Sequence, residues 1–415
     1  MVRKRFREKN LWFISGLALL ICFLSTAKVI AAPDPALLDR ASQVQEEVLK
    51  DLETLVNIDS PADHAPGLEK IKDILSDKLK KLGADIEIFP APKAGYNIVA
   101  TFKGTGKGKI LLLAHADTVF KTGTAAERPF KISDGKAYGP GVIDDKGSIL
   151  TGLYALKILK ERGFRDYARI TFLINCDEEV GSPSSRGLIM KLAQGHDYAI
   201  CLEGGKEGDG LVNWRKGTAR VTVEVKGRAS HAGSAPEKGA NALVELAHQV
   251  LQLRTLENKE KGTTINFTVF HSGDKTNVIP DSAIARADMR THYPEEIERV
   301  KQSGLEMIKN KLVPDTQVKF SLTAGRPAFP KNDKTEALIA RARGIYGEIG
   351  LHLNVGGGGG GTDGNYTALV GTATIDSMGF VGGQGHTADE YMNIDSIPPR
   401  LYLLTRMLME LGSQK

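Results

Sequence analysis

The chain lacks the residues that mark disulfide scaffolds and nucleic-acid-binding proteins. It has only three cysteines in 415 residues, too few for a disulfide framework. Lys and Arg total 55 against 50 Asp and Glu, and we find no basic stripe or nucleic-acid motif, so no nucleic-acid partner is expected. The composition is that of a soluble globular protein, and the length predicts one large domain or two smaller ones.

Residues 1–31 have the three parts of a secretory signal. A basic start, MVRKRFREKN, precedes the apolar run LWFISGLALLICFL and the small-residue end STAKVIAA. The run is about 14 residues long, whereas a membrane span needs roughly 20. We therefore expect cleavage after Ala31 and a periplasmic or secreted protein without stable membrane association. A retained N-terminal membrane anchor is the alternative.

The basic character of the whole chain resides in this segment. Its six Lys and Arg against Glu8 give a net charge of +5, equal to that of the whole chain, so the mature protein is near neutral. Cys22 leaves with the signal. Cys176 and Cys201 lie in apolar runs typical of strands, and we expect them to be buried free thiols rather than a disulfide.

The mature chain alternates apolar strand-like runs with amphipathic helices. Residues 35–58, 66–84, 146–163 and 184–195 have helical spacing, whereas 96–104, 108–117, 169–179 and 197–204 are typical of strands. This alternation predicts an α/β domain with a mostly parallel sheet. The run Gly356–Gly361 stands before Thr362 and Asp363, and we expect a tight loop against a ligand rather than a linker.

Residues 217–327 have a different order of predicted strands and helices. The expected order is strand, helix, strand, strand, helix, strand, over 219–227, 240–256, 264–273, 282–290, 294–312 and 316–323. This is the ferredoxin-like split unit. We therefore predict a catalytic domain formed by 33–216 and 328–415, with an inserted domain at 217–327.

Acidic residues and histidine follow several of the predicted core strands. His115 and Asp117, then Asp177–Glu179, then Glu203 come directly after strand runs, and Asp144–Asp145 lie in a glycine-bounded loop before a helix. Carboxyl ends of parallel strands meet at one sheet edge, where ligands bind. So many carboxylates need cations, and no matching Lys or Arg follows these strands. Histidine with carboxylates suits zinc, and two ions are more plausible than one.

The motifs HADTV, GPGVIDDKG, CDEEVGS, GRASHAGSAPEKGANA, GGGTDGNY and GHTADEY occur in this order along the chain. Together they resemble the zinc exopeptidase family of aminoacylases, bacterial dipeptidases and succinyl-diaminopimelate desuccinylases. The segments YGPGVIDDKG, GRPAF and the C-terminal helix look most like glutamate carboxypeptidases of the carboxypeptidase G type. The resemblance covers essentially the whole mature chain.

The resemblance implies a role for each matching residue. His115 and Glu203 would bind one zinc and Glu179 and His386 the other, with Asp144 bridging them and a cis peptide bond between Asp144 and Asp145. Glu178 would be the general base and Asp117 would orient His115. Asp177 would be structural.

The resemblance also places residues of the inserted domain near the substrate. His231 would polarise the scissile carbonyl, in the family often from the partner subunit of a homodimer. Asn277, Arg290, Arg326 and Gly360 would hold the substrate carboxylate. The chain departs from the carboxypeptidase G type after Glu203, where the expected proline and lysine-bearing loop are absent; Lys206, Arg215 or Lys216 are the candidate substitutes.

The sequence therefore predicts an exopeptidase with two Zn²⁺ per subunit that removes a C-terminal amino acid, with glutamate expected, from N-acyl or folate-like compounds or short peptides. An amidohydrolase or dipeptidase of the same family with another side-chain preference is the first alternative. A non-catalytic binding protein is a second, but the retained Glu178 and metal ligands argue against it. A membrane-anchored structural protein is a third, and would need the signal to be retained.

Overall fold

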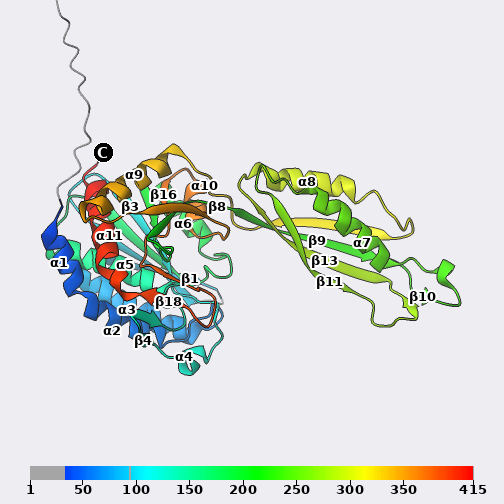
Figure 1. Cartoon of the computed structure of the whole chain (residues 1–415), viewed down its shortest axis with the longest axis horizontal. Helices are drawn as coiled ribbons and strands as arrows, with labels where there is room; N and C mark the ends of the chain where they lie inside the picture. Colours follow the sequence, from blue (N-terminus) through cyan, green and yellow to red (C-terminus); the bar gives the residue numbers. More distant parts are fainter. Residues whose placement is uncertain (1–32, 93–94, 415) are drawn as a thin grey trace, which may run out of the picture.

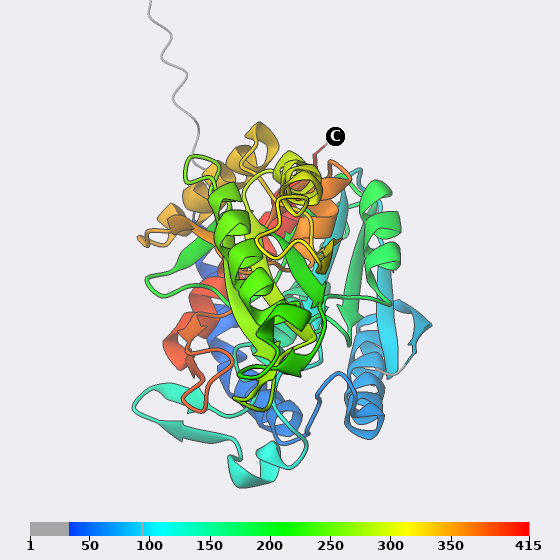
Figure 2. The same ribbon diagram turned by 90° about the vertical axis from the view of Figure 1, so that its right-hand side faces the viewer.

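The computed structural model describes residues 33–92 and 95–414. The predicted signal and its cleavage site lie outside these residues. In the described ranges no helix is both long and apolar enough to cross a bilayer. Figure 1 shows two domains side by side, joined by a narrow junction, with the inserted domain projecting from one side of the catalytic domain. In Figure 2 the inserted domain faces the viewer and lies in front of the catalytic domain.

The catalytic domain is built on a mixed six-stranded sheet. The strand order is β1-β2-β6-β3-β7-β16, with β6, β3, β7 and β16 parallel and β1 and β2 antiparallel at one edge. The central strands are buried on both faces, which explains their continuous apolar sequence. The bounds are β1 Asp85–Ala91, β2 Gly95–Lys103, β3 Lys109–His115, β6 Arg169–Asn175, β7 Tyr198–Cys201 and β16 Ala373–Ile375.

Helices cover both faces of this sheet. One face packs against a large apolar core formed with α1, α2, α3, α5, α9 and α11, and the other packs against α6 and α10. These helices are α1 Pro35–Gln43, α2 Gln45–Val56, α3 Ala65–Leu82, α5 Lys146–Glu161, α6 Arg186–Gln194, α9 Asp333–Glu348, α10 Gly364–Leu369 and α11 Ile397–Gly412. Cys176 and Cys201 are buried and unpaired, as predicted.

Smaller elements complete the catalytic domain. They are α4 Thr124–Glu127, the sheet of β4 Lys131–Ser133, β5 Lys136–Tyr138, β17 Gly382–Gly383 and β18 Tyr391–Asn393, the parallel pair of β8 Gly210–Arg215 and β15 Asn354–Gly358, and the short 3-10 helix Ile394–Ser396. No sequence pattern predicted the parallel pairing between β8 and β15.

The inserted domain is an antiparallel four-stranded sheet covered on one face by two helices. The strand order is β11-β13-β9-β14, and α7 and α8 pack on one face. The predicted split unit and the α/β fold class are confirmed. The bounds are β9 Gly217–Lys226, β10 Ser230–His231, α7 Ala242–Leu253, β11 Thr264–Ser272, β12 Val278–Ile279, β13 Ser282–Thr291, α8 Glu295–Met307 and β14 Gln317–Ala324, with 3-10 turns at Pro236–Lys238 and Arg254–Leu256.

Two local predictions need correction. The helix predicted over 35–58 is interrupted at buried Val44, which separates α1 from α2. Half of the glycine run predicted as a loop is strand β15, and a Cβ on Gly357 would lie 1.7 Å from the Trp214 ring. Glycine is required there by the close approach of an indole, a contact across the fold that sequence spacing does not reveal.

Candidate metal centre

The candidate centre lies at the carboxyl ends of three adjacent parallel strands. His115 is the last residue of β3, Glu178 and Glu179 follow β6, and Glu203 follows β7. Asp144 stands just before α5 and His386 lies in the loop between β17 and β18. The sheet order therefore brings together side chains that are far apart in sequence, at the edge where open α/β sheets bind ligands.

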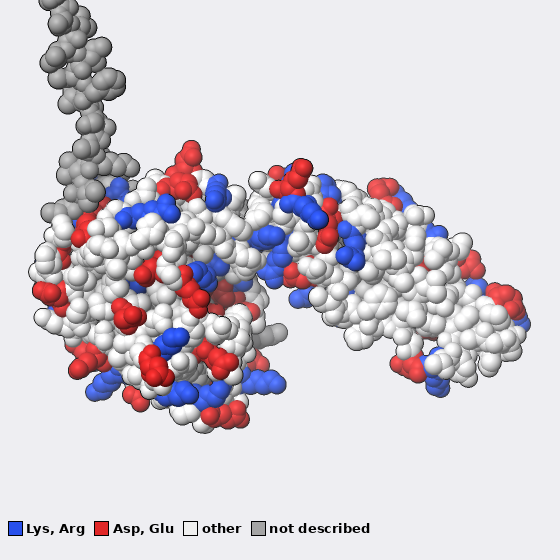
Figure 3. Space-filling model, viewed as in Figure 1, with Lys and Arg blue, Asp and Glu red and all other residues white. Residues whose placement is uncertain are grey.

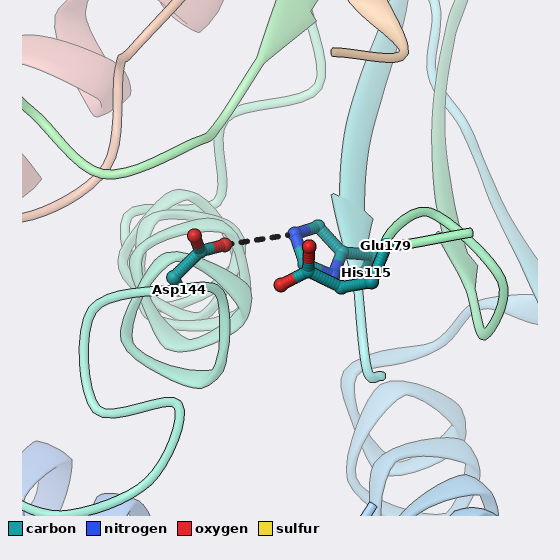
Figure 4. Close-up of side chains that lie close together, drawn as sticks. All are labelled: His115, Asp144 and Glu179. Atoms are coloured by element: carbon teal, nitrogen blue, oxygen red, sulfur yellow. Dashed lines mark hydrogen bonds and ion pairs between the residues drawn. The ribbon is translucent and has the colours of Figure 1, made fainter. Parts of the chain in front are cut away.

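The ligand-type atoms form two groups that share Asp144. One Asp144 oxygen lies 3.1 Å from His115 Nε2, which is 3.9 Å from Glu203 Oε1. The other Asp144 oxygen lies 3.1 Å from His386 Nε2, which is 3.3 Å from Glu179 Oε2. Figure 4 shows Asp144 facing His115, with Glu179 beside them. One carboxylate thus faces two separate imidazole–carboxylate pairs.

Both histidines have pKa values above the ordinary value. Hydrogen bonds to Asp144 and Glu179 raise the pKa of His386 to about 10. Burial alone would lower the pKa of His115, but hydrogen bonds to Asp117 and Asp144 hold it well above the ordinary value. Burial raises the pKa of Glu203 to about 7. The contacts between these carboxylates and the two histidines thus offset part of the mutual repulsion of the acids.

The donor set fits divalent metal. Histidine nitrogens and carboxylate oxygens are what zinc prefers, and His115, Asp144 and Glu179 each offer a ligand atom within 4.8 Å of the others. Glu179 Oε1 is buried without a hydrogen-bond partner in the described part of the chain, which is costly unless a cation completes it.

Asp117 connects the two strand ends. His115 Nδ1 donates to the backbone oxygen of Asp117 at 3.1 Å, which directs Nε2 toward Asp144. The Asp117 carboxylate accepts the backbone N–H groups of Glu178 and Glu179 at 3.1 and 2.9 Å. The Asp177 carboxylate instead accepts from the backbone and hydroxyl of Ser184. Asp117 thus orients His115 and the backbone at Glu178 and Glu179, and Asp177 stabilises the following turn.

The loop that carries Asp144 is held by residues that sequence reasoning missed. The peptide bond Asp144–Asp145 is cis, as predicted, and Asp145 accepts the backbone N–H of His115 at 3.1 Å. Buried Glu390 accepts the backbone N–H groups of Gly141, Ile143 and Asp144 at 3.0 to 3.1 Å. Burial raises the pKa of Glu390 to about 7. Its place in the motif GHTADEY was the only sequence signal.

A second missed residue, Arg128, supports the His386 loop. Its guanidinium donates to the backbone oxygen of Ala388 at 2.8 Å and lies over the Phe120 ring. His386 has a backbone φ of 68° and its side chain is 54% exposed, so the loop has few buried contacts of its own. No motif indicated this contact.

Glu178 is next to Glu179 in this candidate centre, but its carboxylate has a different partner. Its carboxylate lies 2.8 Å from the Arg326 guanidinium, which also donates to the Glu178 backbone oxygen at 2.6 Å. Burial raises the pKa of Glu178 well above its usual range, against the opposing effect of His115 and Arg326. A buried carboxyl with raised proton affinity beside a candidate metal centre is suited to act as a general base.

The structure places the predicted substrate residues in two regions. Arg326 and Arg290 lie at the domain junction, where Arg290 pairs with Asp288 at 2.7 Å and donates to Gly359. His231 and Asn277 belong to the region of β10 and β12, where Ala232 N–H donates to the Asn277 backbone oxygen at 2.9 Å. Figure 1 shows β10 at the end of the inserted domain remote from the catalytic domain. The two regions are not brought together within one chain.

The contacts of the glycine run correct one alternative that the sequence suggested, namely that Arg215 binds a substrate side chain. The Gly360 backbone oxygen accepts from Arg215 at 3.4 Å. Arg215 is itself buried in a two-pronged ion pair with Asp376, at 2.6 and 2.9 Å. Arg215 therefore cannot reach a substrate side chain, and its role is to hold the glycine run.

Comparisons with known proteins agree with this geometry. The Peptidase family M20/M25/M40 matches residues 111–410. Carboxypeptidase G2 of Pseudomonas sp. (strain RS-16) is 39% identical over 95% of this chain and 96% of its own. Succinyl-diaminopimelate desuccinylase of Dechloromonas aromatica is 27% identical over 82% and 92%.

Solved structures share the fold. A tripeptidase from Staphylococcus aureus superposes with a TM-score of 0.78 at 24% identity, over 89% of this chain and 99% of its own. An M20 family metallo-carboxypeptidase from Sulfolobus solfataricus gives 0.68 at 18% identity, over 88% and 99%. With the family match spanning most of the sequence and the ligand-type side chains gathered at one sheet edge, the chain is a metallo-exopeptidase of Peptidase family M20/M25/M40.

Proposed function

We propose that this chain is a two-zinc carboxypeptidase that hydrolyses the amide bond to a C-terminal amino acid, with glutamate preferred. The observation that carries the proposal is the pair of ligand groups sharing Asp144. The similarity to carboxypeptidase G2 supports the choice of a carboxypeptidase. N-acyl amino acids, folate-like compounds and short peptides with a free C-terminal carboxylate are the proposed substrates.

In this proposal His115 and Glu203 would hold one zinc and Glu179 and His386 would hold the other, with Asp144 shared between the two pairs. Zinc bound there would polarise the scissile carbonyl and lower the pKa of a water. Glu178 would accept a proton from the attacking water and deliver it to the leaving amine nitrogen, so that the carboxylate is regenerated.

The first test is hydrolysis of N-acyl amino acids, N-benzoyl-glutamate included, by metal-loaded and chelated enzyme. We expect metal-dependent release of glutamate in preference to neutral residues, with activity restored when zinc is returned. Metal-dependent release of another amino acid would move the specificity to the amidohydrolase or dipeptidase alternative. No release from any substrate by protein with zinc bound would contradict an enzymatic role.

Arg326 is proposed to bind the substrate carboxylate, and Arg326→Ala tests this. The side chain is 12% exposed, and its Nε is buried without a partner in the described residues, so the guanidinium has a donor to offer. We expect KM for N-acyl-glutamate to rise roughly tenfold or more, with kcat less affected, since one charged hydrogen bond is lost. Arg326→Lys should keep part of the affinity. An unchanged KM in both variants would remove Arg326 from the substrate site.

A homodimer is part of the proposal. His231 stands on the inserted domain far from its own metal centre, so it can act only at another subunit's site or after a large movement. Apolar side chains are exposed on the same domain and would be covered in a dimer: Leu243, Val244 and Leu251 on α7, Phe270 on β11 and Val278 on β12. Strand β11 is also a sheet edge.

We propose a periplasmic or secreted location because residues 1–31 have the three parts of a secretory signal. Sequencing the N-terminus of the mature protein would test it. A start at Ala32 would support cleavage, and an intact N-terminus would favour a membrane anchor.

A further inference from the structure

The sheet of the inserted domain has one face that no helix of the described residues covers. Helices α7 and α8 pack on the side chains of Val221, Val223, Ala287 and Met289. Because side chains alternate along a strand, the intervening residues project from the opposite face. We call this the open face, and its residues nearest the catalytic domain are Thr218 and Arg220 on β9, Arg286, Asp288 and Arg290 on β13, and Thr323 on β14.

This end of the open face carries three arginines and one acid. Arg290 is paired with Asp288 at 2.7 and 2.9 Å. Arg220 stands directly opposite Asp288 in the strand register, and Arg286 lies two residues along from it. Arg220 and Arg286 are exposed, and within the described residues neither guanidinium forms a hydrogen bond or an ion pair. The local charge is therefore positive, with two guanidiniums available.

The remote end of the same face is different. There Glu224 on β9 pairs with Lys319 on β14 at 3.6 Å, and Lys226 is the basic residue of β9 at this end. The uncompensated arginines are thus confined to the end of the open face that adjoins the catalytic domain. Figure 3 shows both basic and acidic side chains at the end of the inserted domain that adjoins the catalytic domain.

Hydrogen bonds connect this end of the open face to the proposed substrate site. Arg326 N–H donates to the Thr218 hydroxyl at 2.9 Å, and the Thr218 N–H donates to the Arg326 oxygen at 2.9 Å. Thr218 is two residues from Arg220 on the same face of β9. The Arg290 guanidinium also reaches Gly359 of the glycine run, at 3.4 Å. Arg290 stands opposite Thr218 in the strand register, and Arg220 lies two residues farther along β9 on the same face.

Most of the basic residues of the catalytic domain that the sequence suggested as partners for an acidic substrate side chain already have other partners. Arg215 is buried against Asp376, and Lys216 Nζ donates to the Gly262 backbone oxygen at 2.7 Å. Lys206 stands in an exposed turn closed by its bridge to Gly210. Two of the three cations that the sequence suggested for a substrate carboxylate are already bound elsewhere.

We propose that Arg220, assisted by Arg286, binds a second carboxylate of the substrate and so makes this enzyme selective for acidic substrates. The inference rests on the proposed carboxypeptidase function and adds the residues that recognise the acidic group. A guanidinium binds a carboxylate through two parallel hydrogen bonds, which a neutral amide of the same shape cannot reproduce. The open face therefore discriminates by charge rather than by size.

The test compares N-benzoyl-L-glutamate with its neutral isostere N-benzoyl-L-glutamine. In Arg220→Gln and Arg286→Gln, kcat/KM for the glutamate substrate is expected to fall, by roughly tenfold for Arg220→Gln, while kcat/KM for the glutamine substrate stays within about twofold. Arg220→Lys should retain part of the selectivity. Lys226→Gln is the matched control, because it removes one positive charge from the same strand and face at the remote end and should leave both substrates unaffected.

Binding of the same two ligands to zinc-loaded Glu178→Gln protein, measured by calorimetry, decides the inference even if wild type hydrolyses neither compound. Weaker binding of the glutamate ligand alone in Arg220→Gln, made in the Glu178→Gln background, would support the acidic site and leave catalysis as a separate question. Equal losses for both ligands would show that Arg220 acts on the domain junction, and no change for either would exclude it from the site. Either result would overturn the inference.

Discussion

Glu178→Ala is expected to abolish hydrolysis while the protein keeps its metal. The Glu178 carboxylate lies 2.8 Å from Arg326, whereas the atoms that face the two histidines come from Asp144, Glu179 and Glu203. Removing a general base typically costs about 10²- to 10⁴-fold in rate, and Glu178 would also serve as the acid for the leaving amine. We therefore expect kcat to fall by roughly three orders of magnitude or more, with zinc content per subunit unchanged by elemental analysis.

Two companion variants make this result specific. Glu178→Gln keeps the shape of the side chain. The backbone oxygen of residue 178, which accepts from Arg326, is retained in both Glu178→Ala and Glu178→Gln, so the domain junction should remain intact. Glu179→Gln alters the neighbouring acid, which faces His386 at 3.3 Å, and should lose metal together with activity. A Glu178→Ala enzyme within tenfold of wild type would refute the role of Glu178 as the base. Loss of zinc in Glu178→Ala would instead assign Glu178 to the metal site.

The sequence predicted the parts of the site that follow from regular structure. Apolar runs locate β3, β6 and β7, and the residues at their carboxyl ends meet because these strands are parallel neighbours. His115, Glu179 and Glu203 could therefore be placed at one edge from strand ends alone. Asp144 and His386 were assigned to the same site through the resemblance of the ordered motifs to a family. The family match supports that resemblance.

The remaining contacts depend on loops that no periodic pattern describes. Glu390 is separated by about 250 residues from the backbone N–H groups that it accepts, and Arg128 by a similar distance from the Ala388 oxygen. A lone acid or arginine in sequence carries no sign of such a partner. Arg215 illustrates the converse error, because a cation near the site was a reasonable substrate ligand until its pairing with buried Asp376 became visible.

The geometry of His231 indicates which of its nitrogens would contact a substrate. Its Nδ1 accepts the backbone N–H groups of Gly233 and Ser234 at 3.2 and 3.1 Å. A nitrogen that accepts hydrogen bonds carries no proton, so the proton of the neutral ring resides on Nε2, which is left free to donate. An exposed imidazole with a fixed N–H donor is suited to stabilise an oxyanion on a substrate carbonyl. It stands on β10, at the end of the inserted domain remote from the catalytic domain of its own chain. In the proposed homodimer it would therefore act at the site of the partner subunit.

Subunit mixing tests this arrangement directly. His231→Ala homodimers should lose roughly 10²- to 10³-fold in kcat, as expected for one oxyanion donor, and should keep their zinc. A heterodimer of a His231→Ala subunit with a Glu178→Ala subunit contains one complete site, because the first supplies Glu178 and the second supplies His231 across the interface. Such heterodimers, purified with two different tags, should therefore recover about half of the wild-type activity per dimer. If His231 acted within its own chain, each subunit would lack one essential group and the heterodimer would be as inactive as either parent.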